Sequence, residues 1–181
     1  MRPKPTSPTT TVVAAASDGG GGSDDGAVFQ QPYVAQAAQL SSTQTLHADR
    51  IPGGSQNPAG HNCVGECHSV GLDAGGKPFA AAGTVYTDNT GNTAVGPGVE
   101  VRIRNANGTA QSAFTDENGN WFIRVGQFDI QQNAIPGIRD AVNGPMLMAS
   151  YLGPGAAGGA CAAGTCHVKG APGGVLRVRG P

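Results

Sequence analysis

Apolar and charged side chains alternate without a break in Val99-Glu100-Val101-Arg102-Ile103-Arg104. Successive side chains of a strand point to opposite faces, so this pattern predicts a strand with one buried face. Asn107-Gly108 follows, a dipeptide that favours the tight turn of a hairpin. We therefore expect the chain to reverse there into a second strand over residues 110–115.

Short strands and polar turns extend in both directions from this hairpin. Strands are expected at residues 83–87, 121–125, 146–152 and 175–179, and turns at 88–92 and 116–120. Residues 126–145 read as irregular, and Trp121 and Phe122 as core and turn residues. About six short strands separated by Gly, Asn and Asp predict a mainly β fold, an antiparallel β-sandwich.

The chain divides into three parts. Residues 1–26 are rich in Pro and Thr and then in Gly, Ser and Asp, and predict a flexible arm. Residues 27–78 form an N-terminal segment, in which residues 34–40 predict a short helix (Val34, Ala37, Ala38 and Leu40) and residues 47–78 little regular structure. Residues 79–181 hold the sandwich, interrupted by a Gly- and Ala-rich loop at 153–174.

Composition excludes some classes of function. The net charge of −1 lacks the basic excess typical of nucleic-acid-binding proteins. No apolar run has the length of a membrane span. Aromatic residues make up only 5% of the chain, while 30 of its 181 residues are glycine. Such a chain builds a thin core, to which a bound cofactor would add apolar surface.

All four cysteines lie in two short runs, Cys63-Val64-Gly65-Glu66-Cys67-His68 and Cys161-Ala162-Ala163-Gly164-Thr165-Cys166-His167. A Cys-x-x-Cys-His run is typical of covalent haem attachment, in which two thiols form thioethers and the adjacent imidazole ligates the iron. Here the spacings are longer by one and two residues. The runs predict two c-type haems, attached through the four cysteines and ligated by His68 and His167.

The two remaining histidines complete the expected ligand set. His61 stands only two residues before Cys63, so we expect it to serve the haem held by Cys161 and Cys166, and His47 to serve the first haem or one in a neighbouring subunit. Met146 and Met148 alternate along a strand, which favours core packing over iron ligation. With four imidazoles in use both irons are six-coordinate, which favours electron transfer over catalysis.

Three alternatives stay open. Two local disulfides, Cys63–Cys67 and Cys161–Cys166, would leave a secreted structural or adhesion module without a cofactor. The cysteines could instead form a tetrahedral zinc site. One five-coordinate iron would indicate a haem enzyme or sensor.

Several motifs resemble known families. Gly83-x-Val85, Gly98-Val99-x-Val101-x-Ile103 and Thr115-Asp116-x-Asn118-Gly119-x-Trp121-Phe122 resemble the carboxypeptidase regulatory-like (transthyretin-like) β-sandwich over residues 79–152, a scaffold family without catalysis of its own. The cysteine runs resemble multihaem c-type cytochromes of bacterial extracellular electron transfer.

What the cytochrome resemblance implies is an extracytoplasmic protein, in the periplasm, on the outer surface or outside the cell. It also implies low reduction potentials, with other cytochromes or redox proteins as partners. Because two haems alone span only a short distance, a further hypothesis is that the chain is a repeating subunit of a conductive filament. Residues 12–26 resemble the end of a bacterial lipoprotein signal with its tether, but Ser17 stands where that family has cysteine.

Overall fold

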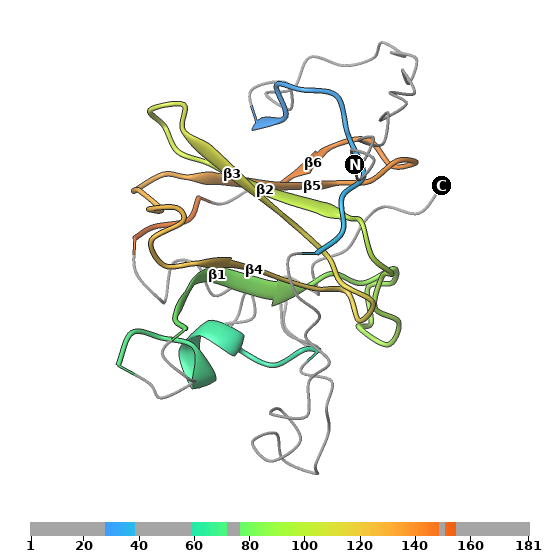
Figure 1. Ribbon diagram of the computed structural model, residues 1–181. Helices are drawn as coiled ribbons and strands as arrows, with labels where there is room; N and C mark the ends of the chain where they lie inside the picture. The colour runs from blue at the N-terminus through green and yellow to red at the C-terminus, as the bar shows by residue number, and fades with distance from the viewer. Residues whose placement is uncertain (1–27, 39–58, 72–76, 149–150, 155–181) are drawn as a thin grey trace, which may run out of the picture.

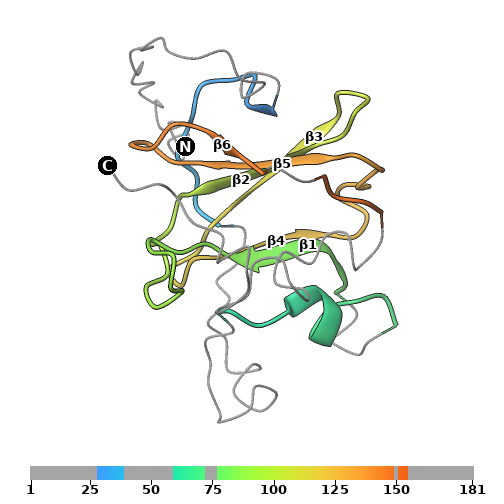
Figure 2. The ribbon, with the colours of Figure 1, turned by 180° about the vertical axis from the view of Figure 1, so that it is seen from behind.

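Two antiparallel sheets make up the body of the protein. The computed structural model describes residues 28–38, 59–71, 77–148 and 151–154. One sheet has two strands, β1 (Phe79–Thr84) and β4 (Asn120–Arg124). The other has four, in the order β3 (Ala110–Phe114), β2 (Glu100–Arg104), β5 (Ile135–Arg139) and β6 (Met146–Leu147). The sheets lie one above the other, and a π-helical turn, η1 (Cys63–Cys67), lies beneath the two-stranded sheet (Figures 1 and 2).

The core fills the space between the two sheets. Val101 and Ile103 of β2 are buried, as the alternating pattern predicts, and Trp121 and Ile123 of β4 pack in the same cluster. The core role predicted for Trp121 is therefore confirmed, whereas Phe122 lies on the opposite, outer face of β4. Met146 packs against the core from β6, in agreement with its predicted role.

The mainly β, antiparallel fold is confirmed, with some strands shifted or shortened. The strands predicted at 110–115 and 121–125 match β3 and β4 closely. The strand predicted at 83–87 corresponds to β1, which begins earlier, at Phe79, and ends at Thr84. It begins earlier because Ala81 and Ala82 pair with β4 despite the low strand preference of alanine. The strand predicted at 146–152 is shorter: β6 ends at Leu147, and Leu152 only bridges Ala134.

Residues 126–145 are not wholly irregular, because they contain β5. The sequence did not predict this strand because it contains Pro136 and Gly137, and both residue types are rare inside sheets. Close packing explains why residue 137 is glycine: a Cβ there would lie 2.7 Å from the Phe29 ring and 2.8 Å from the Leu147 side chain. Register pairs Gly137 with Arg102 on one side and Leu147 on the other.

Two further expectations concern the ends of the chain. The short helix predicted over residues 34–40 is wrong for the described residues, since 32–38 form no helix. Leu40, the arm at 1–26, the loop at 155–174 and the strand at 175–179 lie outside the described residues.

The turn at residues 116–120 is confirmed and joins the two sheets. The carboxylate of Asp116 accepts hydrogen bonds from the backbone N–H groups of Asn118 and Asn120, both at 2.9 Å. Gly119 adopts a φ of +74°, and its carbonyl accepts the Val85 N–H at 2.9 Å. A Cβ at Gly119 would lie 2.6 Å from the Val85 carbonyl oxygen, so both the conformation and the space require glycine.

The turn at residues 88–92 is confirmed as well. The carboxylate of Asp88 accepts hydrogen bonds from the hydroxyl and N–H of Thr90 and from the N–H groups of Asn92 and Thr93. The Thr90 hydroxyl and these backbone donors hold the pKa of Asp88 well below its usual range.

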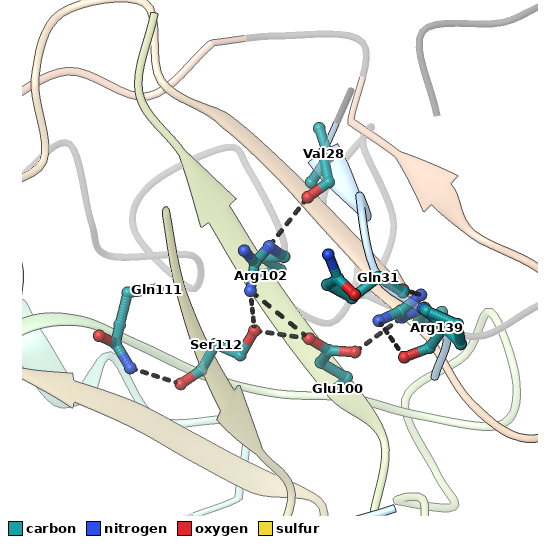
Figure 3. A network of polar contacts seen from close by, with 8 residues as sticks. Val28, Gln31, Glu100, Arg102, Gln111, Ser112 and Arg139 are labelled. Atoms are coloured by element: carbon teal, nitrogen blue, oxygen red, sulfur yellow. Dashed lines mark hydrogen bonds and ion pairs between the residues drawn. The ribbon is translucent and has the colours of Figure 1, made fainter. Parts of the chain in front are cut away.

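An N-terminal strap, residues 28–33, covers the outer face of the four-stranded sheet (Figure 3). Arg139 donates from Nε to Glu100 at 2.7 Å and from Nη1 to the Gln31 carbonyl at 2.7 Å. Arg102 donates to the Val28 carbonyl at 2.8 Å. The Arg139 guanidinium also lies over the Phe29 ring, 4.4 Å from its centroid. The strap therefore buries Glu100, a residue that the alternating pattern places on an exposed face.

We expect Arg139→Met to destabilise the protein by about 3–5 kcal/mol. It removes the 2.7 Å ion pair of buried Glu100 and, among the described residues, leaves this carboxylate only the Ser112 hydroxyl and the Arg102 guanidinium, which is 4.0 Å away. Arg104→Met is the control: Arg104 lies on the same outer face but forms no ion pair within the described part of the chain. Urea unfolding followed by tryptophan fluorescence measures both. Adding Glu100→Gln to Arg139→Met should recover part of the loss. Equal losses for the two single variants would contradict this account.

Gly119→Ala and Gly126→Ala form a second matched pair. Both glycines have positive φ (+74° and +87°), but a Cβ at Gly126 meets nothing within 4 Å. Both variants therefore place alanine in a strained backbone conformation, but only at Gly119 does the new Cβ collide with the backbone. We expect Gly119→Ala to lower the free energy of unfolding by about 1–3 kcal/mol more than Gly126→Ala. Thermal unfolding of the two variants checks this difference, and similar midpoints would disprove the crowding at Gly119.

Candidate functional site

The first cysteine run forms the turn η1 on the outer side of the two-stranded sheet. Asn62 precedes the turn and caps it: its side-chain oxygen accepts the Gly65 N–H at 3.0 Å and its carbonyl accepts the Glu66 N–H at 2.9 Å. The His68 N–H donates to the Cys63 carbonyl at 2.7 Å, which closes the turn. Residues 47–78 were expected to hold little regular structure, so this turn is more ordered than predicted.

Cys63 and Cys67 are the first and last residues of η1, about one helical turn apart. Their environments differ. Cys63 packs against an outer cluster formed by Val64, Ala82, Phe79 and Phe122, whereas Cys67 is exposed. Both are free thiols in this structure. Burial raises the pKa of the Cys63 thiol to about 11, and its S–H lies 3.5 Å from the His61 carbonyl oxygen.

His68 is fixed by the segment that leads into β1. Its Nδ1 lies 3.0 Å from the Lys77 carbonyl oxygen, and its own carbonyl accepts the Phe79 N–H at 2.8 Å. A carbonyl oxygen only accepts hydrogen bonds, so Nδ1 carries the proton and the lone pair of the imidazole lies on Nε2. This is the tautomer and the support that histidine ligands of metals usually have.

Four of the eight predicted site residues lie in or next to η1: His61, Cys63, Cys67 and His68. His61 lies just before η1 with its Nδ1 3.8 Å from the Glu66 carboxylate. The other four predicted site residues are His47, Cys161, Cys166 and His167, and they lie outside the described residues. Within the described ranges, no three Cys, His, Asp or Glu side chains are grouped as a bound metal ion would need.

The donor set of the first run fits covalent haem attachment. Two thiols lie four residues apart on one short turn, an imidazole with its lone pair on Nε2 follows at once, and apolar side chains lie beside Cys63. Cys63, Cys67 and His68 are thus the residues that would hold the group. Asn62, the Lys77 carbonyl and Phe79 support this arrangement and were missed, because capping and ring stacking leave no distinctive pattern in the sequence.

No protein family, curated protein or solved structure matches the chain. Among the described residues, no helix is long and apolar enough to span a membrane.

In the chain without haem, an alkylating reagent at neutral pH should modify Cys67 at least about tenfold faster than Cys63, because burial keeps Cys63 protonated. Peptide mapping by mass spectrometry gives the two rates. Unfolding in urea should make them equal. Equal rates in the folded chain would contradict the burial of Cys63.

The raised Cys63 pKa also links folding to pH. The folded chain holds this proton more tightly than an unfolded thiol, whose pKa is about 8.5. The corresponding stability is therefore present below about pH 8.5 and is lost as the pH rises through about 11. Cys63→Ala should flatten the alkaline fall in stability measured over this range.

Proposed function

We propose that this chain is an extracytoplasmic dihaem c-type cytochrome that transfers electrons. The observation that carries the proposal is the support of His68: its Nδ1 donates to the Lys77 carbonyl, directly after two thiols on one turn. A histidine that merely fills space has no need of a fixed tautomer. The second run, with the same Cys-His ending, supports a second attachment site at Cys161, Cys166 and His167.

When bound, haem supplies a one-electron Fe(III)/Fe(II) couple, whose potential depends on axial ligands, hydrogen bonds and burial. Cys63 and Cys67 would hold the porphyrin covalently, and His68 would present Nε2 to the iron. His61 and His47 are proposed to supply the remaining axial positions, His61 at the second haem and His47 at the first or in a neighbouring subunit. With all four imidazoles in place no position is left for a substrate, which argues for a carrier and not an enzyme.

The two sheets are proposed to be a carboxypeptidase regulatory-like β-sandwich that serves as scaffold. The Thr115-Asp116-x-Asn118-Gly119 turn supports this, because it closes onto Val85 and ties the two sheets together. The η1 turn lies on the outer side of the scaffold, where a second redox protein could approach.

The proposed partners are other cytochromes or redox proteins, or further copies of this chain. Two haems conduct over only a short distance, so a repeating subunit in a filament would extend the path. This part of the proposal rests on the resemblance of the cysteine runs to multihaem cytochromes.

One observation favours a second candidate, a secreted structural module. The core between the sheets closes with the chain's own side chains, and η1 lies outside it. The body therefore does not depend on a porphyrin, and the same scaffold could carry two local disulfides.

The test is to express the full chain in a host with haem-attachment machinery. We expect the intact mass to rise by two haems and the absorption spectrum to show a low-spin Soret band. Cys63→Ser/Cys67→Ser should carry one haem, while Val70→Ser, an exposed position near η1, should keep both. A colourless chain would disprove the proposal. A high-spin band or ready carbon monoxide binding would show an open iron position and contradict the electron-carrier role.

A further inference from the structure

A stack of rings lies on the outer face of the two-stranded sheet. The His68 imidazole and the Phe79 ring are nearly parallel, with centroids 3.9 Å apart and 11° between their planes. Phe79 stacks in turn on Phe122, at 4.6 Å and 14°. The Arg124 guanidinium lies over the Phe122 ring, 5.8 Å from its centroid. The candidate iron ligand is thus part of an ordered stack of rings.

A β-bulge places Phe79 on the same face of the sheet as His68. The register between β1 and β4 shifts between Phe79 and Ala81, so regular alternation is broken at this point. Ala80 and Ala81 both pack toward the core between the sheets, whereas Phe79 and Ala82 both face the outer cluster. Without the bulge, residues 79 and 82 would point to opposite faces. The extra residue therefore gives Phe79 its contact with the imidazole.

The backbone of the same segment holds His68 at two further atoms. The Phe79 N–H donates to the His68 carbonyl at 2.8 Å, and the Lys77 carbonyl lies 3.0 Å from Nδ1. The hydrogen bond at Nδ1 fixes the tautomer, but it leaves the imidazole able to swing about that contact. The flat contact with Phe79 removes this freedom, because a tilted ring would collide with the phenyl face.

We propose that Phe79 is a positioning residue for the iron ligand His68: it fixes the plane of the imidazole and stabilises positive charge on it. The inference rests on the proposed function. The His68 ring carries more positive charge when it ligates ferric iron than ferrous iron, and the π face of a phenyl ring attracts positive charge. Phe79 therefore favours the oxidised state and lowers the reduction potential of the first haem.

Three variants isolate the effect. Phe79→Leu keeps apolar bulk and removes the ring. Phe122→Leu makes the same chemical change in the same outer cluster but away from His68, and is the matched control. Phe79→Tyr keeps the ring and should behave like the native chain. Circular dichroism of each variant shows whether the sheets are intact.

The first measurement needs no haem. In the native chain, the face of Phe79 should shift the ring-proton NMR signals of His68 upfield. We expect Phe79→Leu to lose this shift, and Phe79→Tyr and Phe122→Leu to keep it. A His68 signal unchanged in Phe79→Leu would overturn the stacking on which the inference depends.

The second measurement uses the haem-loaded chain. Phe79→Leu should raise the potential of the first haem and alter its EPR g-values, which respond to the imidazole plane. The second haem serves as an internal reference and should not change. Phe79→Tyr should restore both values.

The outcomes separate the inference from the proposed function. Intact mass reports haem attachment independently of Phe79, so a chain without haem overturns both. Two attached haems with a potential and g-values unchanged in Phe79→Leu overturn the positioning role alone. A change of the same size in Phe122→Leu would assign the effect to the outer cluster as a whole and would also overturn it.

Discussion

The hydrogen bonds of His68 with Lys77, just before β1, and with Phe79, the first residue of β1, connect the candidate site to the two-stranded sheet. The Lys77 carbonyl accepts a hydrogen bond from the His68 imidazole. The Phe79 N–H donates to the His68 backbone carbonyl. Through them, the cysteine turn is attached to a strand whose other contacts are with β4 and the core. Because β1 and β4 are paired along five register positions, the site inherits the rigidity of the sheet.

The two faces of the two-stranded sheet contact different parts of the protein. Trp121 and Ile123 point into the core, where burial stabilises the fold. Phe122, between them in sequence, points outward to the ring stack beside His68. A single alternating strand thus serves stability on one side and the candidate site on the other. Loss of a cofactor would leave the inner face intact, which is why haem attachment and folding can be measured apart.

Much of the fold follows from local sequence. Alternation at 99–104 and the glycine turn at 119 are strong signals, because each depends on neighbouring residues alone. The sequence does not reveal β5, whose Pro136 and Gly137 suit a place beneath Phe29 and beside Leu147, nor the N-terminal strap. Both depend on partners far along the chain, since Arg139 contacts a carbonyl 108 positions away. For the same reason the motif identifies Cys63, Cys67 and His68 but not Phe79, whose contact with His68 needs a bulge.

We propose that imidazoles hold the iron on both sides at two covalently attached haems. Near-infrared magnetic circular dichroism of the oxidised, haem-loaded full chain tests it most directly, because the charge-transfer band of low-spin ferric haem reports the axial ligand pair. We expect a single charge-transfer band, of the energy typical of bis-histidine ligation and of the intensity of two haems. A band of histidine–methionine type, a high-spin signal, or no haem signal at all would contradict it.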